Sequence, residues 1–239
     1  MKNLVLILPF CLLLACKKDQ DPVMENIETL ATTSVTAVQK TYLALGDSYT
    51  IGESVERADT YSYQLAAKLK TAGVNMATPK IFAKTGWTTG ELLEAIRIQT
   101  INKKYDLVTL LIGVNNQYRG NSKITYRSEF KKLLQLSIGY ANGKKDHVFV
   151  VSIPDWGVTP FGKKSGKSQS VIAKDIDAFN AINKEETTLA GVAYINITPD
   201  SRKAATDVSL VASDGLHYSR KMYALWANSL YDPTLQVLK

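Results

Sequence analysis

A serine with the chemistry of a nucleophile follows a short apolar run in the stretch TYLALGDSYTIG. Residues 42–45 predict a buried strand, and Gly46 ends it by permitting backbone angles that other residues avoid. Asp47 and Ser48 favour turns and helix N-termini, so the pattern predicts a sharp turn that presents the Ser48 hydroxyl between a strand and a helix. An alternative interpretation is that Ser48 only caps the helix that follows. Partner residues elsewhere in the chain decide between the two.

A serine hydroxyl becomes a good nucleophile only when a base takes its proton, and that base needs a third group to hold its tautomer. The chain has two histidines. His217 lies three residues after Asp214, so one short turn can bring the carboxylate against the imidazole. His147 opens a predicted strand at the opposite end and is expected to be a structural or surface residue. The simpler alternative is that Ser213 and Asp214 cap a helix and that His217 is a passive surface residue.

The elements that must bring these residues together alternate between strand and helix patterns. Short apolar runs predict strands at residues 42–45, 81–83, 106–112, 147–153 and 192–197. Apolar residues at helical spacing predict helices at residues 60–72, 89–101, 125–141, 168–189 and 219–230. Strands separated by helices indicate a parallel sheet with right-handed crossovers. The predicted fold class is therefore α/β, a flavodoxin-like three-layer α/β/α sandwich around five buried parallel strands.

Polar and small residues follow the first three predicted strands and should meet at one edge of the sheet. Ser48 follows the first strand, Gly86 the second and Asn115 the third. In open parallel sheets, ligands bind beyond the carboxyl ends of the strands. This shared location favours a catalytic role for Ser48 over a purely structural one.

Together with Asp214 and His217, these residues resemble the motif blocks of the SGNH hydrolases, also called the GDSL family of esterases and lipases. The resemblance implies that Ser48 is the nucleophile, His217 the general base and acid, and Asp214 its orienting partner. It also implies an oxyanion hole made by the backbone N–H groups of Ser48 and Gly86 and by the side-chain amide of Asn115. The implied reaction is hydrolysis of a carboxylic ester through an acyl-enzyme, with no metal and no organic cofactor.

The resemblance covers essentially all of residues 41–230, with three departures from the usual pattern. Tyr49 stands where the family name has leucine, Asn116 where an aspartate is common, and Tyr218 where a proline often follows the histidine. None of these changes removes a group that the chemistry needs. Because Asn115 and Asn116 are adjacent, assigning the oxyanion role to Asn115 depends on matching the family's spacing.

Aromatic residues occur on the predicted loops at the same edge of the sheet. Trp87 follows Gly86, Tyr118 lies just after Asn115, and Trp156 comes after the fourth strand. Such side chains can stack on a sugar ring or line an acyl pocket, but they can equally cover the core. Members of the family act on acetylated sugars, lysophospholipids, simple esters and thioesters, so the resemblance leaves the substrate open. Short loops without an obvious lid favour a small or exposed acyl group.

Two readings from other functional classes compete with an esterase. A noncatalytic envelope lipoprotein could use the same fold to bind a glycan or a lipid, and a structural envelope protein would have no pocket. A binding protein has no need of a histidine with its own carboxylate, which favours the enzyme. Reaction of Ser48 with a fluorophosphonate probe would separate the esterase from the noncatalytic binding protein.

The N-terminus predicts export and lipid attachment. Residues 1–15 combine one basic residue with an apolar run too short to span a bilayer, as in a signal peptide. The sequence LLAC resembles a bacterial lipobox, which implies cleavage before Cys16 and lipidation of that cysteine. An ordinary signal peptide with an incidental cysteine is the alternative. We expect residues 16–40 to be a tether, residues 41–239 the hydrolase domain, and the protein to lie in the cell envelope, on the outer membrane.

The charge and the basic segments of the chain point to no other partner. The net charge is +7, which is typical of a solvated basic surface, and no basic and aromatic pattern indicates a nucleic-acid module. Residues 162–168, GKKSGKS, resemble a phosphate-binding P-loop, but three residues separate the glycines where that motif needs four. We therefore expect an exposed basic loop there. The expected partners are a small acyl ester and, through Cys16, a membrane.

Overall fold

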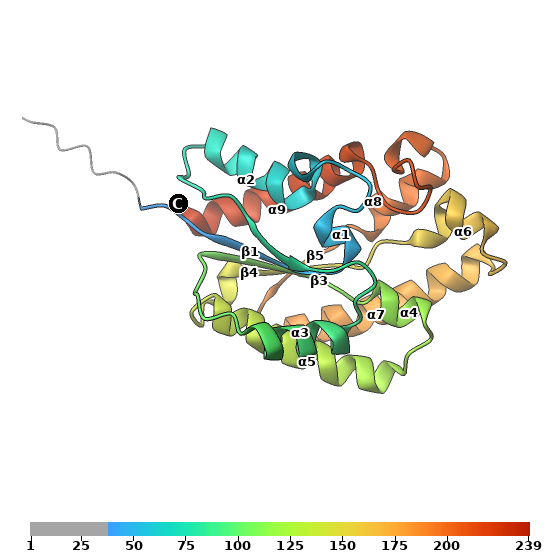
Figure 1. Ribbon diagram of the computed structural model, residues 1–239, viewed down its shortest axis with the longest axis horizontal. Coiled ribbons are helices and arrows are strands. Elements are labelled where there is room, and N and C mark those ends of the chain that lie inside the picture. Colours follow the sequence, from blue (N-terminus) through green and yellow to red (C-terminus); the bar gives the residue numbers. More distant parts are fainter. Residues whose placement is uncertain (1–37) are drawn as a thin grey trace, which may run out of the picture. The chain divides into compact units, whose positions relative to one another are not determined.

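Five parallel strands form the centre of the molecule in the order β2-β1-β3-β4-β5 (Figure 1). The computed structural model describes residues 38–239. The strands are β1 (Tyr42–Gly46), β2 (Lys80–Ala83), β3 (Leu107–Leu111), β4 (Val148–Val151) and β5 (Ala193–Ile195). This strand order is the flavodoxin-like one, so the predicted fold class is confirmed.

Nine α-helices lie in the described part of the chain. They are α1 (Ser48–Ile51), α2 (Tyr61–Thr71), α3 (Thr89–Gln99), α4 (Val114–Tyr118), α5 (Lys123–Tyr140), α6 (Pro160–Lys164), α7 (Gln169–Ala190), α8 (Thr198–Arg202) and α9 (Arg220–Leu238). Helices α2 and α9 pack together over one face of the sheet, while α3, α5 and α7 cover the other (Figure 1). The result is the three-layer arrangement that the alternating pattern predicts.

The path of the chain creates a crevice between β1 and β3. From β1 the chain moves outward to β2, and it then returns past β1 to form β3. In doubly wound sheets this reversal leaves an opening at the carboxyl ends of the two strands, where ligands bind. Gly46 and Leu111 are paired at those ends. The short helices that follow these strands, α1 with Ser48 and α4 with Asn115, therefore flank the opening.

Burial differs between the middle and the edges of the sheet. Every residue of β1, β3 and β4 is buried, as expected for strands covered on both faces. The edge strands β2 and β5 are mostly half-buried, so the prediction of five buried strands is wrong for these two. Each edge strand has only one neighbour in the sheet, and the helices cover it less completely.

The last helix is longer than its apolar pattern predicts. Instead of ending at Leu230, α9 continues through Pro233 to Leu238, about two further turns. Leu230, Thr234 and Leu238 follow one another at four-residue spacing and are all buried, and the Thr234 hydroxyl donates to the Leu230 carbonyl at 2.7 Å. Packing of this face against the core outweighs the hydrogen bond that a proline removes.

The predictions for the signal peptide, Cys16 and most of the tether fall outside the described residues. Lys40, the last residue of the predicted tether, already pairs with Met76, and its N–H donates to the Asn75 carbonyl at 2.7 Å. Within residues 38–239, none of the helices combines the length and the apolar character needed to cross a membrane.

Candidate active site

The turn after β1 is shaped by a close approach of backbone. A Cβ atom on Gly46 would lie 2.2 Å from both the Leu111 carbonyl oxygen and Thr50 Oγ1. The φ angle of Gly46 is not positive, so the prediction that this glycine supplies unusual backbone angles is wrong. Glycine is needed here because no side chain fits between β1, β3 and α1.

Asp47, not Ser48, caps the helix that follows. Its Oδ1 atom accepts a hydrogen bond from the Tyr49 N–H at 3.0 Å. Ser48 is the first residue of α1, and its hydroxyl has no hydrogen-bond partner within residues 38–239. The capping alternative therefore applies to Asp47, and the Ser48 hydroxyl is free to react.

Asp47 is buried in the turn that follows β1. Its side chain is fully buried, and its Oδ2 atom makes no hydrogen bond of normal geometry to any described residue. Burial raises the pKa of Asp47 to about 7, although backbone N–H groups, that of Tyr49 first, offset part of the effect.

His217 and Asp214 are joined directly. The Nδ1 atom of His217 lies 2.5 Å from Asp214 Oδ2, and the N–H groups of Leu216 and His217 both donate to Asp214 Oδ1 at 2.9 Å. Partial burial would raise the pKa of Asp214, but these hydrogen bonds outweigh it and lower the pKa to about 2. The carboxylate is thus held ionised against one ring nitrogen of the imidazole.

Ser54 is a further contact of this pair. Its hydroxyl donates to Asp214 Oδ2 at 2.7 Å, although the two residues lie 160 positions apart. Ser54 has a φ of 66°, in the left-handed region that most residues avoid. Nothing in its sequence context identifies this role, because the contact depends on how two distant loops meet.

Asn115 and Asn116 point to different places. The side-chain amide of Asn115 donates to the Trp87 carbonyl at 3.0 Å, and the residue also lines the pocket described below. Asn116 is buried, with its side chain bonded to both the N–H and the hydroxyl of Thr89 at 2.9 and 2.8 Å. Asn116 thereby fixes the start of α3 to α4, while Asn115 faces the opening.

A cavity of about 200 Å³ at the carboxyl edge of the sheet joins most of the predicted residues. It is lined by Ser48, Tyr49, Thr85, Gly86, Val114, Asn115, Tyr118, Trp156, Phe161, Leu216 and His217. Ser48 and His217 share this lining without a hydrogen bond between them in the described structure. Two larger and more open grooves, of about 660 and 950 Å³, run along α5 and contain none of the predicted site residues.

The three predicted aromatic residues separate into two groups. Tyr118 and Trp156 line the cavity with their rings 5.2 Å apart, edge to face. Trp87 is not part of that lining. Its ring packs 5.9 Å from Phe82, and its carbonyl holds Asn115. Phe161 completes the aromatic wall, 6.1 Å from Trp156.

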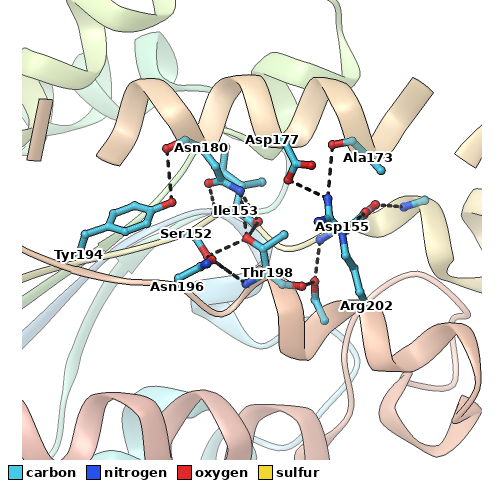
Figure 2. Close-up of polar contacts among 12 residues, drawn as sticks. Ser152, Ile153, Asp155, Ala173, Asp177, Asn180, Tyr194, Asn196, Thr198 and Arg202 are labelled. Atoms are coloured by element: carbon cyan, nitrogen blue, oxygen red, sulfur yellow. Dashed lines mark hydrogen bonds and ion pairs between the residues drawn. The ribbon is translucent and has the colours of Figure 1, made fainter. Parts of the chain in front are cut away.

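A polar network behind this wall follows β4 and β5 (Figure 2). Arg202 lies between Asp155 and helix α7, and it donates to Asp155 Oδ2 at 2.9 Å and to Asp177 Oδ1 at 2.8 Å. Asp155 is buried directly before Trp156, and its carbonyl accepts the Tyr218 hydroxyl at 2.7 Å. Asp155 therefore links the aromatic wall to the loop of His217. The sequence analysis did not identify Asp155 or Arg202.

His147 lies at the opposite edge of the sheet, as predicted. It is buried before β4, and its Nδ1 atom lies 2.6 Å from the Asp106 carbonyl oxygen before β3. Residues 162–168 form the end of α6 and an exposed turn, where Lys167 Nζ lies 5.3 Å above the Tyr118 ring. Within residues 38–239, no group of three or more His, Cys, Asp or Glu side chains is arranged to hold a metal ion.

The sequence matches a known family of hydrolases. The family model described as "GDSL-like Lipase/Acylhydrolase family" matches residues 44–225, about three quarters of the chain. A comparison with curated proteins gave no match.

Solved structures share the fold at low sequence identity. The lipase Lip_vut3 from a goat rumen metagenome has a TM-score of 0.67 and 18% identity, over 84% of this chain and 100% of that one. TesA has a TM-score of 0.65 and 17% identity, over 84% and 100%. The lipase/acylhydrolase from Enterococcus faecalis has a TM-score of 0.63 and 18% identity, over 82% and 96%.

Proposed function

The chain belongs to the GDSL-like lipase/acylhydrolase family and is a carboxylic ester hydrolase, and on that premise we propose that Ser48 is its nucleophile. The observation that best supports this proposal is the meeting of Ser48, Gly86, Asn115 and His217 around one small cavity at the crevice between β1 and β3. These residues come from four separate segments of the chain: the starts of α1 and α4, the turn after β2 and the loop before α9. Packing alone gives no reason for a free hydroxyl, an imidazole and an amide to converge there.

In the proposed reaction, Ser48 Oγ attacks the ester carbonyl while His217 Nε2 takes the hydroxyl proton. Asp214 holds the Nδ1–H of His217 and stabilises the imidazolium that forms. His217 then gives the proton to the leaving alcohol, and the acyl group remains on Ser48. Water, deprotonated by His217, attacks this acyl-enzyme and releases the acid. The Ser48–His217 hydrogen bond is expected to form when substrate enters, as in many enzymes whose free form has looser geometry.

The tetrahedral oxyanion would be bound by the N–H groups of Ser48 and Gly86 and by the amide of Asn115. Asn115 suits this role because an amide nitrogen has two hydrogens. One is used on the Trp87 carbonyl and orients the group, and the other is left for substrate. Asn116 does not fit, since its side chain is bonded to Thr89.

We propose a short acyl ester as substrate. The cavity is small, with a volume of about 200 Å³, which favours a short acyl chain over a long one. Tyr118 and Phe161 are both more than one third exposed at the wall of the cavity. They offer a stacking surface to the alcohol part of the ester, such as a sugar ring. An acetylated carbohydrate fits this arrangement best, and a lysophospholipid or another small acyl ester is the next candidate.

Hydrolysis of p-nitrophenyl acetate, butyrate and a longer ester by the full chain tests these proposals, with Ser48→Ala measured alongside. We expect turnover that falls with acyl length and is lost in the variant. Faster cleavage of the long ester would contradict the short-acyl proposal. If wild type releases no nitrophenolate, labelling by a fluorophosphonate probe decides: labelled Ser48 indicates an intact site, and no labelling indicates a noncatalytic glycan- or lipid-binding protein.

We also propose that the protein is a lipoprotein of the cell envelope, anchored through Cys16 in the outer membrane. The LLAC sequence after an apolar run supports this placement. Several acyl chains at one end would hold the protein firmly at a membrane. The test is the fractionation of cells that express wild type or Cys16→Ser. Wild type should sediment with membranes and the variant should not, and equal distribution would contradict the proposal.

A further inference from the structure

The loop that presents Gly86 is a tight turn with an unusual backbone. The Trp87 N–H donates to the Lys84 carbonyl at 3.2 Å, which closes a four-residue turn. Gly86, the third residue, has a φ of 85°, as type II turns require at that position. Its own N–H has no hydrogen-bond partner among residues 38–239 and is free to face the cavity that Gly86 lines. The direction of this N–H therefore depends on what holds the turn.

Two side chains hold the turn, one from Asn115 in α4 and one from Arg119, which directly follows the last residue of that helix. Asn115 donates to the Trp87 carbonyl at 3.0 Å, and Arg119 Nη2 donates to the Gly86 carbonyl at 2.6 Å. The two residues are four positions apart, so they lie on the same side of α4. The carbonyl groups of Gly86 and Trp87, which are successive in the turn, thus accept hydrogen bonds from Arg119 and Asn115.

Arg119 is itself held from the other side. Its Nη1 atom lies 3.2 and 3.1 Å from the two carboxylate oxygens of Glu91. Glu91 in turn accepts the Thr88 N–H at 2.8 Å, as part of the capping box that begins α3. The planar guanidinium therefore bridges the turn and the start of the next helix, a geometry that a lysine cannot reproduce.

We propose that Arg119 is a positioning residue for the oxyanion hole, which it serves by fixing the peptide of Gly86. Arg119 is not part of the cavity lining and is nearly half exposed, so it acts through the turn and not on the substrate. A donor that is misplaced by a fraction of an ångström loses much of its effect on the transition state. This inference rests on the proposed role of Gly86 in ester hydrolysis.

The test compares Arg119→Ala with Arg97→Ala in the full chain. Arg97 is a matched control because it also forms an Arg–Glu pair, with Glu94 at 2.6 Å on the exposed side of α3, and contacts nothing at the site. For p-nitrophenyl acetate we expect kcat of Arg119→Ala to fall roughly tenfold to a hundredfold, with KM changed by less than about twofold. Arg97→Ala should match wild type. Millimolar guanidinium should restore part of the lost kcat by donating to the vacant Gly86 carbonyl.

A second measurement does not depend on turnover. In 15N-labelled full chain, the heteronuclear NOE of the Gly86 amide should drop in Arg119→Ala and stay unchanged in Arg97→Ala. Unchanged kcat in the folded Arg119→Ala variant would overturn the inference, and so would a loss of kcat with an unaltered Gly86 amide. If Arg119→Ala does not fold, Arg119→Lys takes its place. We then expect kcat and the heteronuclear NOE of the Gly86 amide both to fall below wild type, by less than we expect for Arg119→Ala.

Failure of the ester-hydrolase mechanism is distinguishable from failure of this inference. If wild type neither cleaves the esters nor reacts with the fluorophosphonate probe, the role of Ser48 is refuted. The Gly86 amide then decides alone whether Arg119 positions the turn. A rigid amide in Arg119→Ala refutes the positioning, and a mobile one supports it.

Discussion

Two turns flank the cavity, and each places an aspartate beside a residue of the proposed mechanism. In the turn after β1, Asp47 precedes Ser48 and accepts the N–H of the residue two positions on. In the loop before α9, Asp214 precedes His217 and accepts an N–H at the same spacing, from Leu216. The local geometry is alike, but burial and ionisation differ. Asp47 is fully buried with a pKa raised to about 7, and the exposed Asp214 has a pKa lowered to about 2.

The extent of burial and the number of hydrogen-bond donors together explain this difference in pKa. Asp214 accepts from the His217 ring, the Ser54 hydroxyl and two backbone N–H groups, all of which favour the charged form. Asp47 has one well-formed bond, from Tyr49, to offset complete burial. The same residue type is therefore a helix cap in one turn and the hydrogen-bond partner of the His217 imidazole in the other.

Replacing the two carboxylates separately should give very different activities. Asp214→Asn keeps an acceptor for the backbone but turns an N–H donor toward His217 Nδ1, which selects the wrong tautomer. In such triads this change costs roughly 10³- to 10⁴-fold in kcat. Asp47→Asn keeps the acceptor for Tyr49, so we expect kcat within about tenfold of wild type. Steady-state kinetics on p-nitrophenyl acetate at neutral pH measures both.

The control for this pair is Asp207→Asn. Asp207 is an exposed aspartate that also accepts the N–H two residues on, from Ser209, and it is not part of the cavity lining. It should keep wild-type activity. Equal losses of kcat in Asp47→Asn and Asp214→Asn would contradict the proposal that Asp47 is a structural cap and that Asp214 orients His217.

The pH dependence of stability should also differ between the two turns. The folded-state pKa of Asp47 is about 7, above its unfolded value near 4, so the folded state binds the extra proton between these pH values. Its contribution to stability is therefore lost as the pH rises from about 4 to about 7. The opposite holds for Asp214, whose contribution is present above about pH 4 and is lost as the pH falls toward 2.

Urea unfolding of wild type and Asp47→Asn from pH 4.5 to 7.5 measures this effect. The wild type should lose about 3 kcal/mol relative to the variant over that range, because one pKa unit corresponds to about 1.4 kcal/mol and most of the shift lies between pH 4.5 and 7. Asp146→Asn, which alters an exposed aspartate, serves as the control and should follow wild type. If wild type and Asp47→Asn stay parallel, Asp47 does not titrate in this range.

The sequence was sufficient to predict the fold and which residues gather at the candidate site, because both depend on local patterns. The strands and helices follow from apolar spacing, and the topology of a parallel sheet places Ser48, Gly86 and Asn115 at one edge. The pairing of Asp214 with His217 also follows from a three-residue spacing. These inferences need only neighbouring residues and a rule about chain direction.

What the sequence could not show depends on contacts between distant segments. Ser54 reaches Asp214 across 160 residues, and Arg202 reaches Asp155 across 47. The role of Gly46 was predicted from backbone angles, yet the structure shows that its lack of a side chain is what matters. Arg119 combines the two cases. Its four-residue spacing from Asn115 is a local feature of the sequence, but its contact with the Gly86 carbonyl depends on how two distant segments meet.

The smallest expected effect concerns Ser54, whose hydroxyl connects Asp214 to the segment after α1. Ser54→Ala removes one of four hydrogen bonds to Asp214 while the bond from His217 remains. An exposed hydrogen bond to a charged group is worth about 1 kcal/mol, so kcat should fall by no more than about fivefold. Ser229→Ala, which removes an exposed hydroxyl bonded to the Leu225 carbonyl, should have no effect. A loss as large as that of Asp214→Asn would show that Ser54, and not the local turn, sets the orientation of the carboxylate. Activity equal to wild type would show that the local N–H groups and His217 are enough to orient the Asp214 carboxylate. Asp214 would then have hydrogen bonds to spare, whereas the buried Asp47 has a single well-formed one.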